Sequence, residues 1–514
     1  MWRPTRRQLI SLSLFVFVLA VSLSTSLLLL KREALQFHTR DYNYFVEQAA
    51  RLTDPNLAKS FALNIEGYNL QGLQGLEGVK SLYHAIHAEY FRYTYALLYG
   101  IFRDTLPVYI FYSLIFFLPI VYLALLPHAD RRSHFFLWLI FSALYLLYPA
   151  TLNAVTSDLR PRMLFAAAWC LAVLAVAYRR PFLEKLAAFG LLLAIREEGI
   201  LLGGFVIALN YLLMKGRPGR RLQTLVFLGL ETAAAAAFLA FMAWGGYTRV
   251  DSAYNPLGFL WTFLSNPLLL ALSILLLGAA LLGLSWFKKR SGIDAVILLT
   301  IYLGAVALTG AQWLRDTARA FLSLTQANAG TWQYVLAAFT NETTALVAYI
   351  SIPGLALGWS VSRGRARRAL SGLVAGLAVL FALITAAYMP AQIAQWRQNL
   401  APARLVWDFA VGHDRYQTKV LLDYATYQAF YNFDQVIVYN RLPVWDTLPE
   451  KRYYPQNKAA VAIQIRKGIA YAVIGRESLA NVRELASLAG VPAYELAAND
   501  RYVILQFQPA RPAP

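Results

Sequence analysis

Membrane-length apolar runs recur along this chain and restrict its fold more than any other feature. Each run of about 18 or more apolar residues is long enough to cross roughly 30 Å of hydrocarbon. Of the 514 residues, 58% are hydrophobic and only 15% are charged, whereas soluble domains carry about 25% charged residues. We therefore predict a polytopic α-helical membrane protein.

The apolar runs predict about eleven transmembrane helices. The first run follows three arginines, but its length and the lack of a small-residue cleavage site indicate an uncleaved helix rather than a signal peptide. The predicted ranges are 9–30, 106–126, 134–155, 163–178, 182–195, 199–214, 223–244, 266–287, 292–312, 343–361 and 369–389.

The basic residues between these runs predict the orientation of the chain. The formal net charge of +19 is spread over short clusters rather than one patch, which argues against nucleic-acid binding. With a cytoplasmic N-terminus, every basic turn falls on the cytoplasmic side, and the C-terminal segment lies outside the cell membrane. These turns carry Arg131/Arg132, Arg179/Arg180, Lys215/Arg217/Arg220/Arg221, Lys288/Lys289/Arg290 and Arg363/Arg365/Arg367/Arg368.

Two domains are expected. Residues 1–390 form the transmembrane domain, with a long first outside loop at 31–105 in which residues 80–102 have the pattern of a helix lying in the membrane interface. Residues 391–514 contain β-branched and aromatic runs at 433–439, 469–474 and 502–507, with a helical stretch at 479–488. This order predicts a small extracytoplasmic α/β domain.

The fifth and sixth predicted spans are short, and the polar sequence Arg196-Glu197-Glu198-Gly199 separates them. The charges of the flanking turns favour a tight outside turn between two short helices. Half-length helices usually line a cavity, because protein or water must satisfy their ends.

Four polar groups are expected to converge on the outer face, since charged residues near membrane depth tend to face cavities or substrates. Each also has a structural reading: a helix N-cap for Asp41, wet interfacial histidines, a solvated Asp–Arg turn, and a hydrophilic Glu–Glu turn. The groups are His38 with Asp41, His84 with His87, Asp158 with Arg160 and Arg162, and Arg196 with Glu197 and Glu198.

No cofactor is certain from the sequence. Two neighbouring histidines with a carboxylate from elsewhere could bind a divalent metal ion, but this spacing is common by chance. Walker loops, dinucleotide fingerprints and nucleophile elbows are absent. The single cysteine, Cys170, lies in an apolar run, so it forms no intrachain disulfide and is expected to be packing material.

The order of a first helix, a long outside loop opening with Asp, short helices and an external C-terminal domain resembles the GT-C class of membrane glycosyltransferases. Residues 30–215 resemble more closely a bacterial and archaeal family of membrane proteins of unknown function placed near that class. The matching positions are Asp41, Phe45 and Gln48, then His87, Asp158-Leu159-Arg160-Pro161, and Arg196-Glu197-Glu198. Arg160 replaces a histidine of that family.

The resemblance implies transfer of a sugar from a polyprenyl-phosphate donor to an acceptor at the outer face. Asp41 would be the catalytic base, and arginines would stabilise the leaving lipid phosphate. The substrate-binding set would be His87, Asp158, Arg160, Arg162, Arg196, Glu197 and Glu198. Among these, Glu198 or His87 could orient the acceptor or hold a metal ion.

Two other classes of function fit the same composition. A transporter would line a permeation path with the same polar groups, although the sequence shows neither internal repeats nor two similar halves. A non-catalytic scaffold would present the C-terminal domain to a partner. The donor sugar, the acceptor and the oligomeric state have no signature in the sequence.

Overall fold

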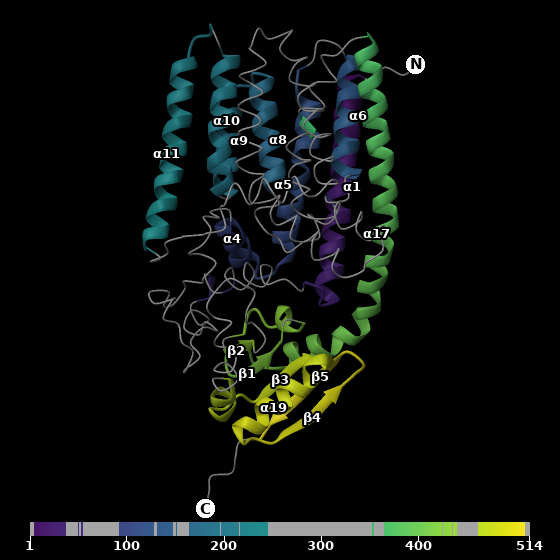
Figure 1. Ribbon diagram of the computed structural model, residues 1–514, viewed down its shortest axis with the longest axis vertical. Helices are drawn as coiled ribbons and strands as arrows, with labels where there is room; N and C mark the ends of the chain where they lie inside the picture. The colour runs from purple at the N-terminus through teal and green to yellow at the C-terminus, as the bar shows by residue number, and fades with distance from the viewer. Residues whose placement is uncertain are drawn as a thin grey trace, which may run out of the picture.

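A computed structural model shows a bundle of helices standing side by side, with a small sheet below one end (Figure 1). The residues it describes are 5–37, 50, 53–54, 92–127, 131–147, 151, 164–195, 197–214, 216–244, 352–353, 364–423, 425–433, 435–438 and 461–508. The protein is thus rich in helix and also contains the small α/β sheet that the sequence predicts.

The first seven predicted apolar ranges and the last one coincide with helices. These are α1 (Arg6–Glu33), α5 (Leu106–Leu125), α6 (Arg131–Leu147), α8 (Phe165–Ala177), α9 (Phe182–Ile195), α10 (Glu197–Leu213), α11 (Arg220–Trp244) and α17 (Gly364–Gly412). The ranges 266–287 and 292–312 lie outside the described residues, and only residues 352–353 of the range 343–361 are described.

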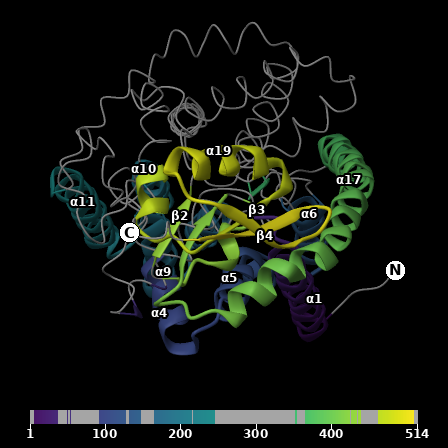
Figure 2. The ribbon, with the colours of Figure 1, turned by 90° about the horizontal axis from the view of Figure 1, so that it is seen from below.

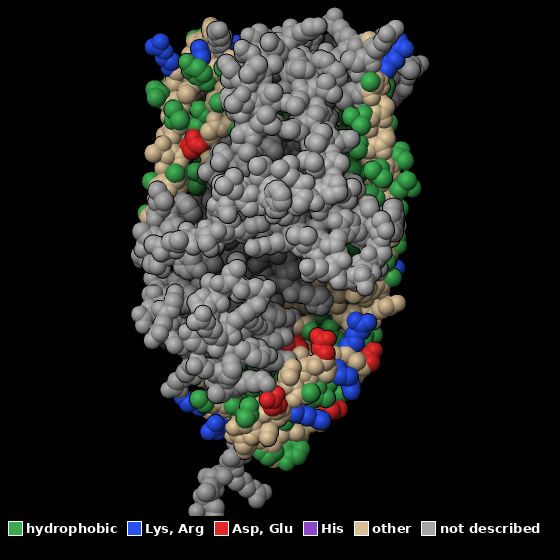
Figure 3. All heavy atoms as spheres, in the orientation of Figure 1, with side chains coloured by type: hydrophobic (Ala, Val, Ile, Leu, Met, Phe, Trp, Pro, Cys, Tyr) green, Lys and Arg blue, Asp and Glu red, His purple; other side chains and the backbone are tan. Residues whose placement is uncertain are grey.

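Three of the described helices are long and apolar enough to cross a membrane, by length and composition. They cover Arg6–Glu33, Leu106–Leu125 and Ser371–Gly412, and shorter apolar helices cover Ser133–Leu147, Phe165–Ala177 and Gly203–Leu213. Apolar side chains lie along the outer edges of α11 and α17 in Figure 3. These features are compatible with a membrane location, and the number of eleven spans stays a prediction.

Short polar side chains allow α1 and α5 to pack closely. The hydroxyls of Ser24 and Ser113 lie 2.7 Å apart, and Ser13 donates a hydrogen bond to the carbonyl of Ile120. Trp138 of α6 donates its indole N–H to Ser13 over 3.2 Å, so a third helix joins this contact. Small hydroxyl residues are common at helix interfaces in membranes, because they let two backbones approach.

The basic turns lie at one end of the bundle. Arg6 at the start of α1 donates to the carbonyl of Leu125 at the end of α5, and His134 of α6 bonds to the carbonyl of Leu123. The α10–α11 turn and the start of α17 lie at the same end, whereas the sheet lies at the other (Figure 1). The described turns among those predicted to be cytoplasmic therefore share one end, whereas the turn at Lys288/Lys289/Arg290 lies outside the described residues. Their side of a membrane remains a prediction.

Helix α17 is 49 residues long and runs across the predicted domain boundary at 390. It flanks the bundle and then bends where it reaches the sheet (Figure 1). Pro390 and Pro402 lie inside it, and a proline removes one backbone hydrogen bond and favours a bend. The last predicted span and the C-terminal sheet are therefore joined by continuous helix.

The sheet has five strands in the order β2-β1-β3-β5-β4. Strand β1 pairs in parallel with β2 and β3, and β5 pairs antiparallel with β3 and β4. The strands are β1 (Lys419–Leu422), β2 (Gln435–Val438), β3 (Tyr471–Gly475), β4 (Ala493–Ala498) and β5 (Tyr502–Phe507), with helix α19 (Leu479–Ala489) before β4. The predicted runs at 433–439, 469–474, 502–507 and 479–488 are confirmed as β2, β3, β5 and α19.

Helices cover both faces of this sheet, as Figure 2 shows. On one face, Val406 and Phe409 of α17 pack against Val420 and Val473. On the other face, Val482 of α19 belongs to a second cluster of buried residues. Alternate strand residues thus face different cores, which explains why the strands are apolar throughout.

Asp423 joins the carboxyl ends of β1 and β3. Its carboxylate accepts hydrogen bonds from the backbone N–H of Gly475 and the hydroxyl of Ser478, each over 2.7 Å, and from the hydroxyl of Thr426 over 3.1 Å. Burial raises the pKa of Asp423, and these donors oppose that shift. Because its oxygens are occupied by the protein itself, we interpret Asp423 as a structural residue.

A single amide ties the bundle to the sheet. The side chain of Asn399 in α17 is fully buried. Its N–H₂ group donates to the carbonyl of Ala34, which caps the end of α1, and to the hydroxyl of Tyr502 in β5 over 2.7 Å. This contact fixes α1, α17 and the sheet relative to one another.

Replacing Asn399 with Ala should lower the free energy of unfolding by about 1–3 kcal/mol, because it leaves a buried carbonyl and a buried hydroxyl without their donor. Thermal unfolding of the purified chain in detergent would measure the change. Gln398→Ala is the matched control, since residue 398 is exposed on the same helix. Equal midpoints for the two variants would contradict this role of Asn399.

Candidate functional site

Most residues of the predicted site lie outside the described part of the chain. Their predicted convergence on one cavity therefore stays a prediction. The residues outside are His38, Asp41, His84, His87, Asp158, Arg160, Arg162 and Arg196, whereas Glu197 and Glu198 are described as backbone only, at the start of α10.

The predicted tight turn between the fifth and sixth spans is confirmed. Helix α9 ends at Ile195 and α10 begins at Glu197. Gly199 makes this close return possible, because a Cβ at that position would lie only 1.9 Å from the carbonyl oxygen of Leu192. In Figure 1, α10 begins at its lower end, which faces the sheet but lies well above it. Acidic residues in the first turn of a helix also stabilise its N-terminus, so Glu197 has a structural role available.

Gly199→Ala should lower the free energy of unfolding by about 1–3 kcal/mol, the usual cost of an overpacked contact. Gly190→Ala is the control on the neighbouring helix, because a Cβ there meets nothing within 4 Å. It should be neutral, or stabilising by up to about 1 kcal/mol through helix propensity. Thermal unfolding measures the stability of both variants. Equal unfolding midpoints for Gly199→Ala and Gly190→Ala would show that α9 and α10 are not packed so closely.

The end of α1 has a well-defined cap at the sheet end of the bundle. The N–H of Gln36 donates to the carbonyl of Lys31, and the N–H of Leu35 donates to that of Arg32, which is the Schellman arrangement. Leu35 occupies the left-handed position with φ 53°, where glycine is usual. Its side chain is fully buried beside Ala403, so apolar burial offsets the backbone strain.

Cations and aromatic rings surround this cap. The ammonium of Lys31 lies 4.8 Å from the ring centroid of Phe37, and the guanidinium of Arg32 lies 5.3 Å from that of Trp407. Trp407 donates its indole N–H to the carbonyl of Glu33 over 3.1 Å. Such cation–π contacts place positive charge at the boundary between the apolar helices and the sheet.

Two tyrosines from distant parts of the chain meet beside the cap. Tyr99 lies in α4 (Arg92–Phe102), the described part of the predicted interfacial helix, and its ring centroid is 6.0 Å from that of Tyr431. Burial and the neighbouring Tyr431 raise the pKa of Tyr99, while Arg415 and Arg103 act in the opposite direction. Burial also raises the pKa of Tyr431, against the effect of Arg32. Both phenols therefore stay protonated and can donate hydrogen bonds.

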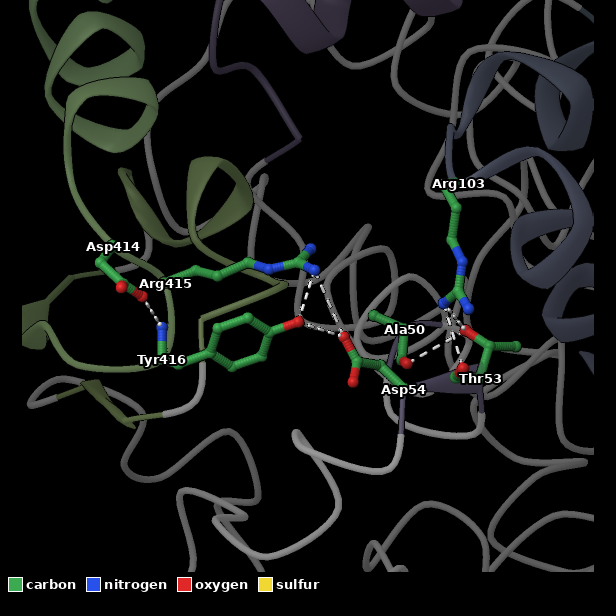
Figure 4. Close-up of polar contacts among 7 residues, drawn as sticks. All are labelled: Ala50, Thr53, Asp54, Arg103, Asp414, Arg415 and Tyr416. Atoms are coloured by element: carbon green, nitrogen blue, oxygen red, sulfur yellow. Dashed lines mark hydrogen bonds and ion pairs between the residues drawn. The ribbon is translucent and has the colours of Figure 1, made fainter.

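Asp54 in the first loop joins the C-terminal segment through two groups (Figure 4). Its Oδ2 accepts a hydrogen bond from the hydroxyl of Tyr416 over 2.7 Å and lies 3.4 Å from the guanidinium of Arg415. Asp414 fixes this turn by accepting the backbone N–H of Tyr416 over 2.8 Å. The carboxylate of Asp54 is largely buried, so this charged pair is partly desolvated.

Arg103 adds a further cation from the start of the second span. Its guanidinium donates to the carbonyl of Thr53 over 3.0 Å (Figure 4). Within the described residues its hydrogen-bond partners are the neutral oxygens of Thr53. We use the name junction site for the set formed by Arg32, Asp54, Tyr99, Arg103, Arg415, Tyr416 and Tyr431.

The junction site has the chemistry of an anion-binding surface. Guanidinium and phenol groups are hydrogen-bond donors that bind phosphate and carboxylate oxygens well. No three His, Cys, Asp or Glu side chains gather in a way that could hold a metal ion, among the residues that the structure describes. A divalent metal ion at the predicted site residues stays a prediction, because most of those residues are not among the described ones.

The comparisons add no relative: a scan against protein-family models finds no match to this chain, and a search of curated proteins finds no similar protein. The resemblance drawn from the sequence is therefore an interpretation of short motifs.

The sequence analysis did not identify the junction site. Asp54 and Arg415 are 361 positions apart, and no spacing rule links such residues. One local signal was present, since Arg103 and Asp104 stand directly before an apolar run, where charged residues mark the membrane boundary. No pattern in the sequence indicates that Tyr99 and Tyr431 lie side by side.

Asp54 and Arg415 should be energetically coupled. The variants Asp54→Asn and Arg415→Gln and their combination form a double-mutant cycle, and we expect a coupling of about 0.5–1 kcal/mol, near the upper end for partly exposed pairs. Thermal unfolding supplies the values. Arg483 and Glu495, 3.9 Å apart and both exposed, should show coupling near zero. Equal coupling in the two cycles would argue against a special role for the Asp54 contact.

Proposed function

We propose that this protein is an integral membrane glycosyltransferase of GT-C-like architecture, which transfers a sugar from a polyprenyl-phosphate donor to an acceptor at the outer face. The observation that carries the proposal is the junction site. It collects guanidinium and phenol groups at the end of membrane-length helices, which is the level at which a lipid phosphate would lie.

The described contacts support a role in donor binding. The guanidinium of Arg103 donates to the neutral oxygens of Thr53, so a phosphate would be its natural counter-ion. Tyr99 and Tyr431 interact through their hydroxyls, with Tyr99 as the donor, so the O–H of Tyr431 would be the one offered to an anion. In a mostly buried setting such a hydrogen bond is stronger than in water. Charge developing on the leaving lipid phosphate would be stabilised by these groups.

The proposed base, Asp41, follows Phe37 by four residues in the sequence. Phe37 is fully buried, and its backbone N–H donates to the side-chain oxygen of Gln428 over 3.2 Å, beside the same junction. Four residues of chain span at most about 14 Å, so a base at position 41 is compatible with the proposed site. A carboxylate there could accept the proton of the acceptor hydroxyl.

The remaining parts of the proposal follow the resemblance. Arg160, Arg162 and Arg196 would contact the donor phosphate, and His87, Asp158, Glu197 and Glu198 would bind the acceptor or a divalent metal ion. The full architecture would have about eleven spans, with the N-terminus in the cytoplasm and residues 391–514 outside.

Asp41→Asn should lower the transfer rate by about 100- to 10,000-fold, because the amide cannot accept the proton. Asp500→Asn, at an exposed position near the end of the sheet, should match the wild type. Arg103→Ala should chiefly weaken donor binding and raise the KM for the donor. The measurement is an in vitro assay of purified protein with polyprenyl-phosphate-linked sugars.

Two results would count against this account. If Asp41 only caps a helix, Asn would replace it without loss, because Asn caps as well as Asp does. Inactivity of the wild type with every polyprenyl-phosphate sugar tried would favour the scaffold or transporter readings instead.

A further inference from the structure

Lys185 in α9 is a buried cation at the basic end of the bundle. Its side chain is almost wholly buried. The ammonium donates to the side-chain oxygen of Asn210 in α10 over 2.9 Å and to that of Gln223 in α11 over 2.6 Å. Both partners are neutral amides, and no carboxylate lies within ion-pair distance of Lys185 among the described residues.

A buried charge is costly unless an opposite charge accompanies it. The adjacent carboxylate of Glu184 cannot serve, because it forms a bidentate pair with Arg180 at 2.8 Å and accepts a hydrogen bond from Tyr122. Two neighbouring helices, α10 and α11, therefore present only neutral amide oxygens to Lys185. This arrangement leaves its positive charge uncompensated within the described part of the chain.

The groups around Lys185 are also donors. The amide nitrogen of Asn210 is buried without an acceptor in the described contacts, and so is Nε of Arg220, whose guanidinium lies 3.4 Å from the ring centroid of Tyr211. Arg217 is close enough to act on Lys185 electrostatically. Excess donors and excess positive charge around the α10–α11 turn fit an anion with several oxygens.

Exposed leucines flank this cluster and indicate the source of the anion. Leu183 is 75% exposed, Leu222 66% and Leu225 65%. Figure 3 shows basic side chains at the upper end of α11, with apolar side chains below them along the same edge. A phospholipid would place its phosphate against the cations and its acyl chains along the leucines, whereas a free phosphate would make no use of that apolar edge.

We propose that Lys185, Asn210, Arg217 and Arg220 bind the phosphate headgroup of an anionic phospholipid at the basic end of α9, α10 and α11. This site lies at the end of the bundle away from the junction site, and it is independent of the proposed transfer reaction. Its role is to supply the negative charge that the described residues around Lys185 do not provide.

The test measures thermal unfolding of the purified full chain in a neutral detergent during titration with phosphatidylglycerol, phosphatidylcholine or inorganic phosphate. A ligand that binds the folded state raises the unfolding midpoint as its concentration rises. We expect phosphatidylglycerol to stabilise the wild type, with little effect of phosphatidylcholine or inorganic phosphate. Lys185→Met and Arg217→Gln should weaken the apparent affinity about five- to tenfold.

The controls separate binding from folding. Arg466→Gln removes an exposed charge near the sheet and should respond like the wild type. If Lys185→Met does not fold, two other variants decide the question. Lys185→Arg keeps the charge and should bind phosphatidylglycerol like the wild type. Arg217 is exposed, so Arg217→Gln should fold and still show the weaker binding. Unchanged phosphatidylglycerol affinity in Arg217→Gln and Lys185→Met would overturn the site. Stabilisation by inorganic phosphate equal to that by phosphatidylglycerol would overturn the lipid as its ligand.

Discussion

The bond from the buried Asn399 amide to the carbonyl of Ala34 is the contact on which the arrangement of the molecule depends. The same amide reaches Tyr502 in the sheet, so one side chain joins the first helix, the long α17 and the C-terminal strands. Because α17 is continuous from the bundle into the sheet, the sheet has little freedom to move once this joint forms. The two buried partners of Asn399, the carbonyl of Ala34 and the hydroxyl of Tyr502, also make this joint specific. Each would lose its hydrogen bond if α1, α17 and the sheet packed in another arrangement.

The junction site is a consequence of this joint. The chain leaves the cap of α1 at Ala34 toward Phe37, and Arg32 in the last turn of α1 lies against Trp407. Tyr99 and Tyr431 meet nearby. The contact between Asp54 and Arg415 then closes the first loop onto the C-terminal segment. The proposed donor-binding site thus lies beside the contact made by Asn399, and loss of that contact would disturb both the packing and the site. The two ends of the bundle also differ in chemistry. The end near the sheet carries the arginines and tyrosines of the junction site, and the basic end contains Lys185 among buried hydrogen-bond donors.

Much of the fold was predictable because its signals are local. Apolar runs indicated the helix positions, and short runs of β-branched and aromatic residues indicated three strands of the sheet. Helix α17 was harder to predict, because Pro390 and Pro402 normally indicate a helix end, and here packing against the sheet stabilises the helix beyond them. The junction site was not predictable: its carboxylate and its arginine come from opposite ends of the sequence, and only the folded joint brings them together. Glu184 and Lys185 are the two charged residues of the apolar segment 182–195, which was a signal that could have been used. The predicted residues Asp41, His87, Asp158, Arg160, Arg162 and Arg196 lie outside the described part of the chain.

The most direct test of the joint is a cross-link between positions 33 and 407. The backbone of Glu33 and the indole of Trp407 are in hydrogen-bond contact, and the single native cysteine, Cys170, is buried and should not react. Cysteines introduced at 33 and 407 should be joined within one chain by a short bismaleimide in intact membranes, as detected by mass spectrometry of the linked peptides. A folded double variant in which both cysteines react with monofunctional maleimide but form no intrachain link would contradict the account.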